Sequence, residues 1–475
     1  MITAVCLGCD PLANPVSGPV DFSSDTVFFD TVFTTVGSVT REFRAINRNS
    51  DPLLIDRIYL GGGTESPFRL NINGTPAASS EEITLAKGDS LFVFIDVTID
   101  PVNKDNPVAM LDSVIFESGS YTGRVILEAW GQDIWLIEDH ETGNAVWTEG
   151  KPYVITGSFL VDTTATLTLG AGTRVYFHHD AGMTVAGRLV SDGTAEKPVL
   201  FATDRLEPAY NDVPSRWKGI SFLDCSTNNI LNHTEVRNAV IAVSLEGNPS
   251  VAPDLTLNGA MLMHNSVASL VASNAEVLAV NTVFAHSGFS TVSLTEGGTY
   301  DFIHCTMDNW WEYSFRSEPV MFIGKSGGVL PEVTVLNTVI SGSLDDELTI
   351  DAPSSETAGV FYADSSLIKV DTTGSEWYVS TLFENVQTSF LPRFIDESTY
   401  DYRPDTLSPL IDHAGKMESL LYPYDIRNKP RPTGSGSDIG AYERQPGEKK
   451  EAVGSRSRSA IGGSRILVPL GGTGQ

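Results

Sequence analysis

The residues best suited to ligand chemistry lie between positions 304 and 316. Trp310 and Trp311 are adjacent, and aromatic side chains of this kind stack on the apolar faces of sugar rings. Their polar neighbours are Glu312, His304, Asp308 and Arg316. An arginine can pair with a carboxylate through two hydrogen bonds. The segment is therefore a candidate ligand-binding site made of Trp310, Trp311, His304 and Arg316. The alternative is a loop whose aromatic side chains pack against the body of the protein.

A second candidate is the run Asp345, Asp346 and Glu347. Three carboxylates could offer oxygen ligands to Ca²⁺, the one cofactor that the sequence suggests. Consecutive strand residues point to opposite faces, so the three cannot all converge on one ion. The chain also has no D-x-D-x-D-G loop. A solvated acidic turn is the alternative interpretation.

Histidines form a third group. His178 and His179 precede Asp180 and follow Tyr176, but neighbouring strand residues point opposite ways. Four further histidines recur at His233, His264, His286 and His304. We expect these to stack at equivalent turns, as Asn238, Asn265 and Asn309 would, rather than to bind a metal. No Ser-His-Asp order, G-x-S-x-G elbow or phosphate-binding glycine loop appears, so no catalytic residue is predicted.

The elements that must position these residues repeat. Similar short segments start at 233, 259, 281, 304 and 337, which gives intervals of 26 (259 − 233), 22 (281 − 259), 23 (304 − 281) and 33 (337 − 304). A period in the low twenties is typical of a parallel β-helix, with one set of strands per coil. About 300 residues would make roughly 12 coils at roughly 25 residues each. The long interval places an extended loop near Trp310, and loops often carry function.

Residues 20–133 follow a different pattern. Short alternating apolar runs are separated by turn residues, and no helical pattern occurs. About seven strands in some 110 residues predict a β-sandwich. The chain is therefore expected to be all-β, with a sandwich at 20–133, a β-helix at 134–445 and a flexible basic tail at 446–475.

The composition argues against several classes of protein. The chain has 475 residues and a net charge of −29, so it should repel nucleic-acid backbones. With 41% hydrophobic and 19% charged residues, it can form real cores and is not expected to be largely disordered. No run of 18 apolar residues could cross a membrane as a helix. Cys225 and Cys305 are expected to be two buried, unbridged thiols.

The first nine residues, MITAVCLGC, look like the end of a secretion signal with a bacterial lipobox, and residues 1–19 would be the signal remnant and linker. Cys9 would then be the lipidated residue, although a charged start is missing and the apolar stretch is short. The alternative is a frayed terminus with two free cysteines, Cys6 and Cys9. Lipidation would anchor the chain to a membrane.

Two resemblances support this organisation. The run FFDTVFTTVGSVTREFRAINRNSDPLLIDRIYL resembles the immunoglobulin-like N-terminal segment of Bacteroidota surface lipoproteins. The runs LTLGAGTRVYFHHDAGMTVAGRLVSDGTAEKPVLFAT and RWKGISF are similar to the first coils of right-handed parallel β-helices of the pectin-lyase-like class. The ending DIGAYE resembles the closing segment of the choice-of-anchor Q class. Most of the chain is covered by these likenesses.

Two functions remain open. The first is a non-catalytic, lipid-anchored outer-membrane protein, exposed at the cell surface, whose rigid β-helix is a scaffold or interaction subunit for other envelope proteins. The second, implied by the β-helix resemblance, is a protein that binds surface polysaccharides, or a lyase or glycoside hydrolase that acts on acidic glycans. Three convergent carboxylates in a groove near 300–350 would favour the second.

Overall fold

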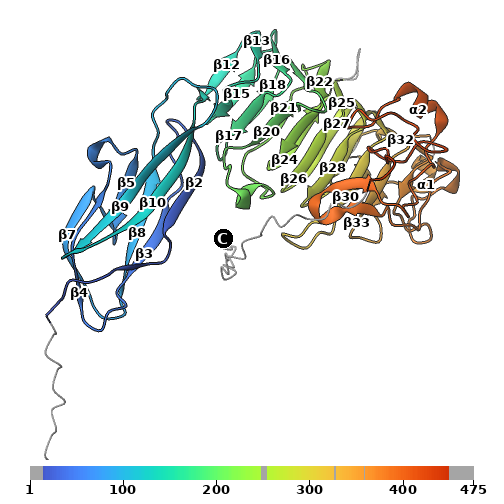
Figure 1. Ribbon diagram of the computed structural model, residues 1–475. Coiled ribbons are helices and arrows are strands. Elements are labelled where there is room, and N and C mark those ends of the chain that lie inside the picture. The colour runs from blue at the N-terminus through green and yellow to red at the C-terminus, as the bar shows by residue number, and fades with distance from the viewer. Residues whose placement is uncertain (1–13, 248–253, 326–327, 358, 449–475) are drawn as a thin grey trace, which may run out of the picture.

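The protein is an all-β chain with two domains, as the computed structural model shows for residues 14–247, 254–325, 328–357 and 359–448 (Figure 1). Residues 1–13 and 449–475 lie outside the described residues, so Cys9, the lipobox and most of the basic tail stay predictions. No helix in the described part of the chain is both long enough and apolar enough to span a membrane.

The N-terminal domain is a sandwich of two five-stranded sheets. The first sheet has the order β1 (Asp21–Phe22), β3 (Arg41–Ile46), β8 (Ser90–Val97), β5 (Phe68–Ile72) and β6 (Thr75–Pro76). The second has the order β2 (Thr26–Phe33), β10 (Tyr121–Gln132), β9 (Val108–Ser118), β4 (Leu53–Leu60) and β7 (Ser79–Leu85). Alternate residues of both sheets face inward, and Phe43, Phe68 and Phe116 lie at the centre of this core.

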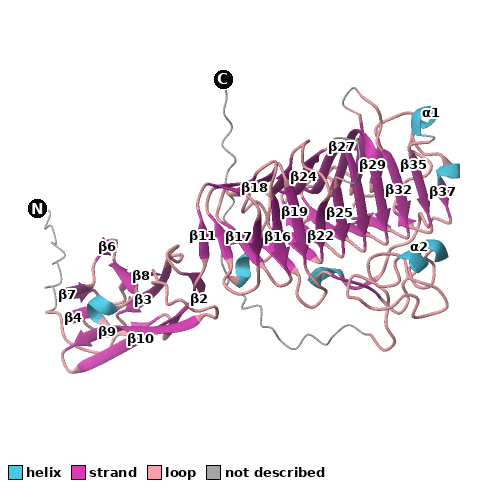
Figure 2. Cartoon of the chain, turned by 90° about the horizontal axis from the view of Figure 1, so that it is seen from above, coloured by secondary structure: helices cyan, strands magenta, loops and turns pink. Residues whose placement is uncertain are grey.

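The second domain is a parallel β-helix whose coils stack strand upon strand (Figure 2). Its first face is one ten-stranded parallel sheet. Its strands are β11 (Trp135–Ile137), β14 (Tyr153–Ile155), β17 (Arg174–Phe177), β20 (Val199–Thr203), β23 (Thr234–Arg237), β26 (Met261–Asn265), β28 (Val283–Ser287), β30 (Thr306–Asn309), β33 (Val339–Gly342) and β36 (Leu367–Ile368). The described residues thus form ten strands on this face, fewer than the roughly 12 coils expected.

The other two faces belong to one continuous 17-stranded sheet. The second face consists of β12 (His140–Thr142), β15 (Ser158–Val161), β18 (Gly182–Val185), β21 (Ile220–Phe222), β24 (Ile241–Glu246), β31 (Met321–Gly324) and β34 (Leu348–Ile350). The third consists of β13 (Ala145–Trp147), β16 (Thr166–Gly170), β19 (Arg188–Asp192), β22 (Asn229–Asn232), β25 (Leu255–Asn258), β32 (Glu332–Leu336), β35 (Phe361–Asp364) and β37 (Phe383–Glu384). Two long strands, β27 (Ala268–Val280) and β29 (Val292–Ile303), run through the corner and belong to both faces.

Several of the recurring residues lie at one turn of the coil. On five successive coils, one residue between the third face and the next first-face strand has a positive φ. These residues are His233 (38°), Gly259 (68°), Asn281 (49°), His304 (51°) and Asn337 (51°). Asparagine, histidine and glycine tolerate this left-handed conformation better than most residues. Backbone geometry therefore accounts for the sequence period.

A closing segment, residues 386–448, packs on the outside of the first face (Figure 2). It contains β38 (Phe394–Asp396), β39 (Asp401–Pro404) and α2 (Lys416–Leu421), whereas the other short helix, α1 (Ser354–Thr357), precedes it. Phe394, Tyr402 and Ile439 of the segment pack on Val283 and Val339 of the sheet. This segment therefore forms an outer layer over the first face.

Hydrogen bonds hold the closing segment to the repeated turn. The Asn281 Nδ2 donates to the Tyr424 carbonyl at 3.0 Å. The Gly415 N–H donates to Asn337 Oδ1 at 2.6 Å. Asn281 and Asn337 therefore serve two purposes, since each ends one coil and also holds the closing segment.

Candidate functional site

A cavity of about 390 Å³ lies on the outer surface of the β-helix where four segments meet. These are the loop that follows the 3-10 turn Pro208–Tyr210, the ends of β26 and β28, the loop after β30, and the 3-10 turn Glu397–Thr399 of the closing segment. Its lining consists of Asp212, His264, His286, Trp310, Trp311, Glu312, Tyr313, Glu397, Ser398 and Tyr400. The volume is typical of a small-molecule site.

Two stacked histidines and a tyrosine form one part of the lining. The rings of His264 and His286, on consecutive coils, have centroids 5.2 Å apart and an interplanar angle of 23°. Tyr400 meets both rings edge-on, at 4.5 and 4.7 Å. Burial lowers the pKa of each histidine to about 3, with smaller effects from Arg237 on His264 and from His264 on His286. Both imidazoles are therefore neutral at pH 7.

Three aromatic rings form the opposite part. Trp310 is 38% exposed and Tyr313 is 56% exposed, so both offer ring surface to solvent. The centroids of Trp311 and Tyr313 are 5.1 Å apart. The Tyr313 hydroxyl donates to the Asp212 carbonyl at 3.0 Å, which joins this loop to a coil about one hundred residues earlier. The loop is thus held with its aromatic faces open.

The ionisable lining is acidic. Asp212, Glu312 and Glu397 are its carboxylates, and neither lysine nor arginine is among the lining residues. Asp212 Oδ1 lies 3.7 Å from His264 Nε2. Burial, followed by the charge of Asp396, raises the pKa of Glu397. Carboxylate oxygens accept hydrogen bonds from hydroxyl or ammonium groups.

The structure brings Trp310 and Trp311 into this cavity but places His304 and Arg316 elsewhere. His304 is fully buried at the repeated turn, and its Nε2 lies 3.1 Å from Asn337 Nδ2 and 3.3 Å from Ser419 Oγ. Arg316 is buried, and its guanidinium pairs with Glu347. Both residues hold the structure together and are not available to a ligand in this cavity.

The three carboxylates at 345–347 do not form a cluster. Asp345 is exposed, whereas Asp346 accepts hydrogen bonds from the Asp371 N–H and the Ser375 hydroxyl. Glu347 is fully buried against Arg316. In the described part of the chain, no three His, Cys, Asp or Glu side chains are grouped so that they could hold a metal ion. These residues lie in the loop between β33 and β34, where each carboxylate has a different environment.

His178 and His179 lie in the turn after β17 and have different partners. His178 pairs with Asp204 at 2.5 Å, whereas His179 pairs with Asp180 at 3.0 Å on the exposed surface. The recurring histidines divide between two turns: His233 and His304 lie at the turn before the first face, and His264 and His286 lie at the turn after it. All four have a positive φ.

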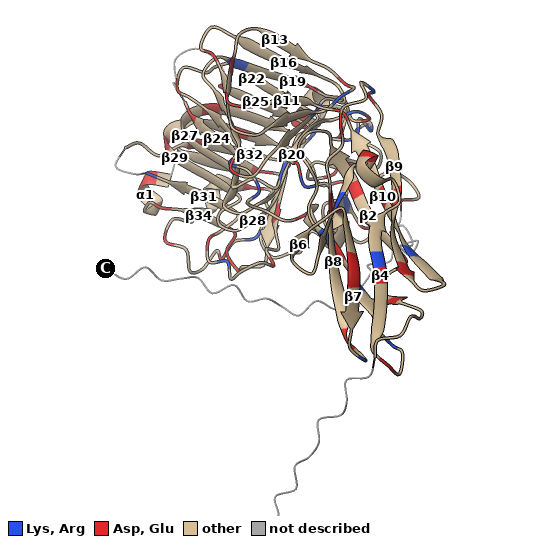
Figure 3. Cartoon of the chain, turned by 90° about the vertical axis from the view of Figure 1, so that its left-hand side faces the viewer, with Lys and Arg blue, Asp and Glu red and all other residues tan. Residues whose placement is uncertain are grey.

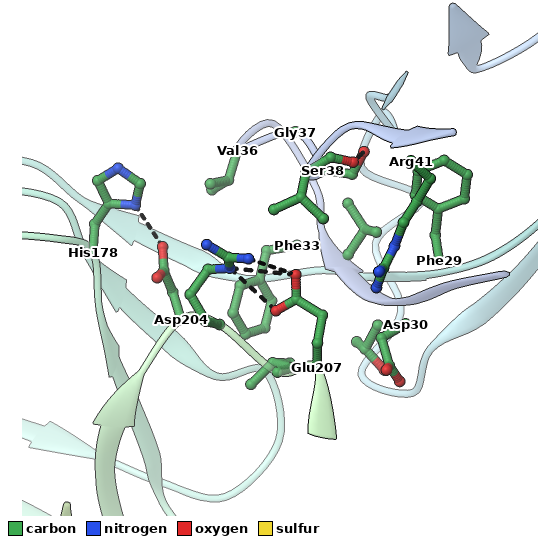
Figure 4. Close-up of a pocket in the computed structure, with 15 residues that line it drawn as sticks. Phe29, Asp30, Phe33, Val36, Gly37, Ser38, Arg41, His178, Asp204 and Glu207 are labelled. Atoms are coloured by element: carbon green, nitrogen blue, oxygen red, sulfur yellow. Dashed lines mark hydrogen bonds and ion pairs between the residues drawn. The ribbon is translucent and has the colours of Figure 1, made fainter. Parts of the chain in front are cut away.

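A second cavity, of about 220 Å³, lies at the junction of the two domains (Figure 4). Four of its charged groups form pairs within it: His178 pairs with Asp204, and Arg205 forms a two-pronged pair with Glu207. Asp30 and Arg41 of the sandwich also line it. Phe33 of the sandwich packs on Tyr176 of the β-helix beside it, with ring centroids 5.1 Å apart. These contacts describe an interface between domains, so we do not treat this cavity as the candidate site.

Of the two cysteines that were expected to be buried, one is exposed. Cys305 is fully buried, but Cys225 is exposed because it lies in the turn after β21. Both are free thiols, as expected.

Sequence reasoning missed Asp212, Tyr313, Glu397 and Tyr400. No local pattern marks them, because they come from three loops that are far apart in the sequence and meet only in the folded chain. Asp212 also lies in the irregular insertion between β20 and β21, a length anomaly that could have indicated a functional loop.

No family model matches the chain, and no curated protein matches it. Among solved structures, a family 123 glycoside hydrolase from Clostridium perfringens that hydrolyses glycolipid glycans has 10% identity and a TM-score of 0.18. The match covers 26% of each chain, so this chain spans about a quarter of that protein. The catalytic domain of an α-1,3-glucanase of glycoside hydrolase family 87, in complex with nigerose, has 9% identity and a TM-score of 0.22, over 74% of this chain and 87% of that one. At such TM-scores neither likeness supports an argument about function.

Proposed function

We propose that the protein binds a carbohydrate in the cavity between Trp310, Tyr313 and Tyr400. The observation that carries this proposal is the combination of solvent-exposed aromatic faces with carboxylates in one cavity. Aromatic faces pack on the C–H surfaces of a sugar ring, while Asp212, Glu312 and Glu397 accept hydrogen bonds from its hydroxyls.

The same geometry argues against acidic glycans as ligands. Uronic acids would bring further carboxylates against Asp212, Glu312 and Glu397, with no lysine or arginine in the lining to pair with them. The proposal therefore keeps the glycan-binding alternative but changes the expected charge of the glycan. The scaffold and outer-membrane hypotheses stay predictions, since no observation on the described residues favours them.

The test is calorimetric titration of the purified chain with neutral, amino-substituted and acidic oligosaccharides. We expect binding that Trp310→Ala and Trp311→Ala each weaken roughly tenfold, which is about 1.4 kcal/mol. Trp130→Ala is the matched control, because Trp130 is 44% exposed but lies on the sandwich. Failure of every class of glycan to bind, or equal loss in the control, would refute the proposal. Carboxylate pairs also serve glycosidases as acid and base, so the mixtures should be assayed for released sugar.

A further inference from the structure

We propose that the glycan carries free amino groups, so that the cavity recognises a cationic amino sugar. This inference rests on the proposed carbohydrate-binding function and specifies its ligand. It comes from the charges and ring faces that line the cavity.

The first argument is the balance of charge. Asp212, Glu312 and Glu397 line the cavity, and neither lysine nor arginine does. Two arginines outside the lining act on it: the charge of Arg237 lowers the pKa of His264, and the charge of Arg216 opposes the raised pKa of Tyr313. The Arg216 guanidinium lies 5.3 Å from the centre of the Tyr210 ring. A ligand cation would therefore meet carboxylates without competition from a lining cation.

The second argument is that the histidines do not supply the missing positive charge. His264 and His286 are packed under Tyr400 and against each other, and burial keeps both imidazoles neutral at pH 7. They can still accept a hydrogen bond. The Nε2 atom of His286 is buried and has no hydrogen-bond partner within the protein.

The third argument is the aromatic lining. A cation over the face of a tryptophan or tyrosine is attracted by the ring electrons, and tryptophan is the best of these partners. Trp310 and Tyr313 expose ring surface next to the carboxylate of Glu312. This pairing of ring faces with carboxylates suits an organic ammonium group.

The fourth argument concerns the kind of cation. A divalent metal ion needs several oxygen or nitrogen ligands within a short distance of one point. Across the described ranges of the chain, no group of three His, Cys, Asp or Glu side chains meets that need. The carboxylates of the cavity therefore surround a larger space, about 390 Å³. A space of this size fits an organic cation better than a bare metal ion.

The test compares two ligands that differ only at nitrogen: oligomers of glucosamine, and N-acetylglucosamine oligomers of the same length and linkage. We expect the free amine to bind the full-length chain roughly tenfold more tightly. Raising the salt concentration should reduce that preference, because salt screens exposed charges. Two further ligands are titrated in the same way: oligogalacturonate, which is an acidic oligosaccharide, and choline, which is an organic cation without a sugar ring.

Glu312→Gln and Glu397→Gln should each weaken binding of the amine more than binding of the acetylated oligomer, because the amide keeps an oxygen that accepts a hydrogen bond from a hydroxyl but loses the negative charge. Glu81→Gln is the matched control, because it removes one exposed carboxylate from the sandwich edge strand β7. Circular dichroism would confirm that each variant folds.

Each other outcome has a distinct meaning. Equal or tighter binding of the acetylated or acidic oligomer would overturn the amino-sugar inference while carbohydrate binding stands. Choline binding as tightly as the glucosamine oligomer would overturn the sugar component of the inference. Absence of binding by any ligand would overturn both this inference and the proposed function.

Discussion

The guanidinium of Arg316 lies 2.6 and 2.8 Å from the two carboxylate oxygens of Glu347, and almost no part of either side chain reaches solvent. Glu347 also accepts hydrogen bonds from the Val320 and Leu344 N–H groups. Arg316 donates to the Asn309 carbonyl, next to Trp310. The pair therefore holds the loop that carries the two tryptophans against the next coil.

Arg316→Ala is expected to lower the free energy of unfolding by about 3–5 kcal/mol, because it leaves the Glu347 carboxylate buried and unpaired. Denaturant titration measures this change. Lys325→Ala is the control, since Lys325 pairs with Glu356 at a partly exposed site and such pairs contribute about 1 kcal/mol or less. Equal effects of the two substitutions would contradict a structural role for the buried pair.

Asp308 predicts a pH dependence of stability. It is fully buried on β30, accepts a hydrogen bond from the Ser341 hydroxyl, and burial raises its pKa to about 8. Because the unfolded carboxyl has a pKa near 3.9, the unfolded chain loses this proton between about pH 4 and 8 while the folded chain keeps it. This residue alone should therefore lower stability by about 1.4 kcal/mol per pH unit as pH rises through that window.

Asp308→Asn should remove that contribution, because the amide does not ionise. The stability of the variant relative to the native chain should increase from pH 5 to pH 8 in urea titrations. Parallel curves for the two proteins would show that Asp308 is ionised in the folded state.

Gly219 predicts a backbone constraint at the start of β21. Its φ is +109°, and a Cβ atom there would lie 1.6 Å from the Ile241 carbonyl oxygen on the next coil. We expect Gly219→Ala to cost at least about 2 kcal/mol or to prevent folding. Gly143→Ala is the control, since nothing lies within 4 Å of the added atom, and it should change stability by less than about 0.5 kcal/mol. Thermal unfolding distinguishes the two, and a stable Gly219→Ala protein would contradict the close approach of the coils.

The two described cysteines should react at different rates. Cys225 is exposed, whereas Cys305 is buried and burial raises its pKa to about 12. A maleimide reagent should label Cys225 in the native protein and label Cys305 only after denaturation. Peptide mass spectrometry assigns the labelled sites. Rapid native labelling of Cys305 would show that its coil opens.

The junction between the domains predicts a fixed arrangement of sandwich and β-helix. Phe33 packs on Tyr176, and Lys151 Nζ lies 2.7 Å from Asn103 Oδ1 across the same junction. Tyr176→Ala should loosen this contact and increase the radius of gyration in small-angle X-ray scattering. Tyr362→Ala, on the third face of the β-helix, is the control. An unchanged scattering profile would mean that other contacts suffice.

The fold was predictable because local rules determine it. Asn281, His304 and Asn337 recur because the turn that each occupies has a positive φ, which asparagine and histidine tolerate. The run RWKGISF also has a local cause. Its tryptophan, Trp217, stacks on Phe177 of the previous coil with ring centroids 3.9 Å apart. Its glycine, Gly219, has no Cβ atom and so allows the next coil to approach.

The site was only partly predictable. Trp310 and Trp311 were found because they lie together in an unusually long coil. Arg316 and Glu347 were assigned to separate sites, since nothing local shows that residues 31 positions apart on successive coils form one buried pair. Tyr400 was missed because its place over His264 depends on the path of the closing segment.

Surface charge is distributed over both domains (Figure 3), so the acidic composition alone did not indicate the cavity. The cavity is marked instead by three carboxylates that line it together with exposed aromatic rings and with neither lysine nor arginine.

The closing segment also determines when the cavity can exist during synthesis. Coils that contact only their neighbours can form in order as the chain emerges, so His264, His286 and Trp310 can reach their positions early. Tyr400 and Glu397 arrive only when the closing segment folds back over the first face. A nascent chain therefore presents an apolar, uncovered sheet before it presents a binding site, and competence to bind ligand reports that the outer layer has docked.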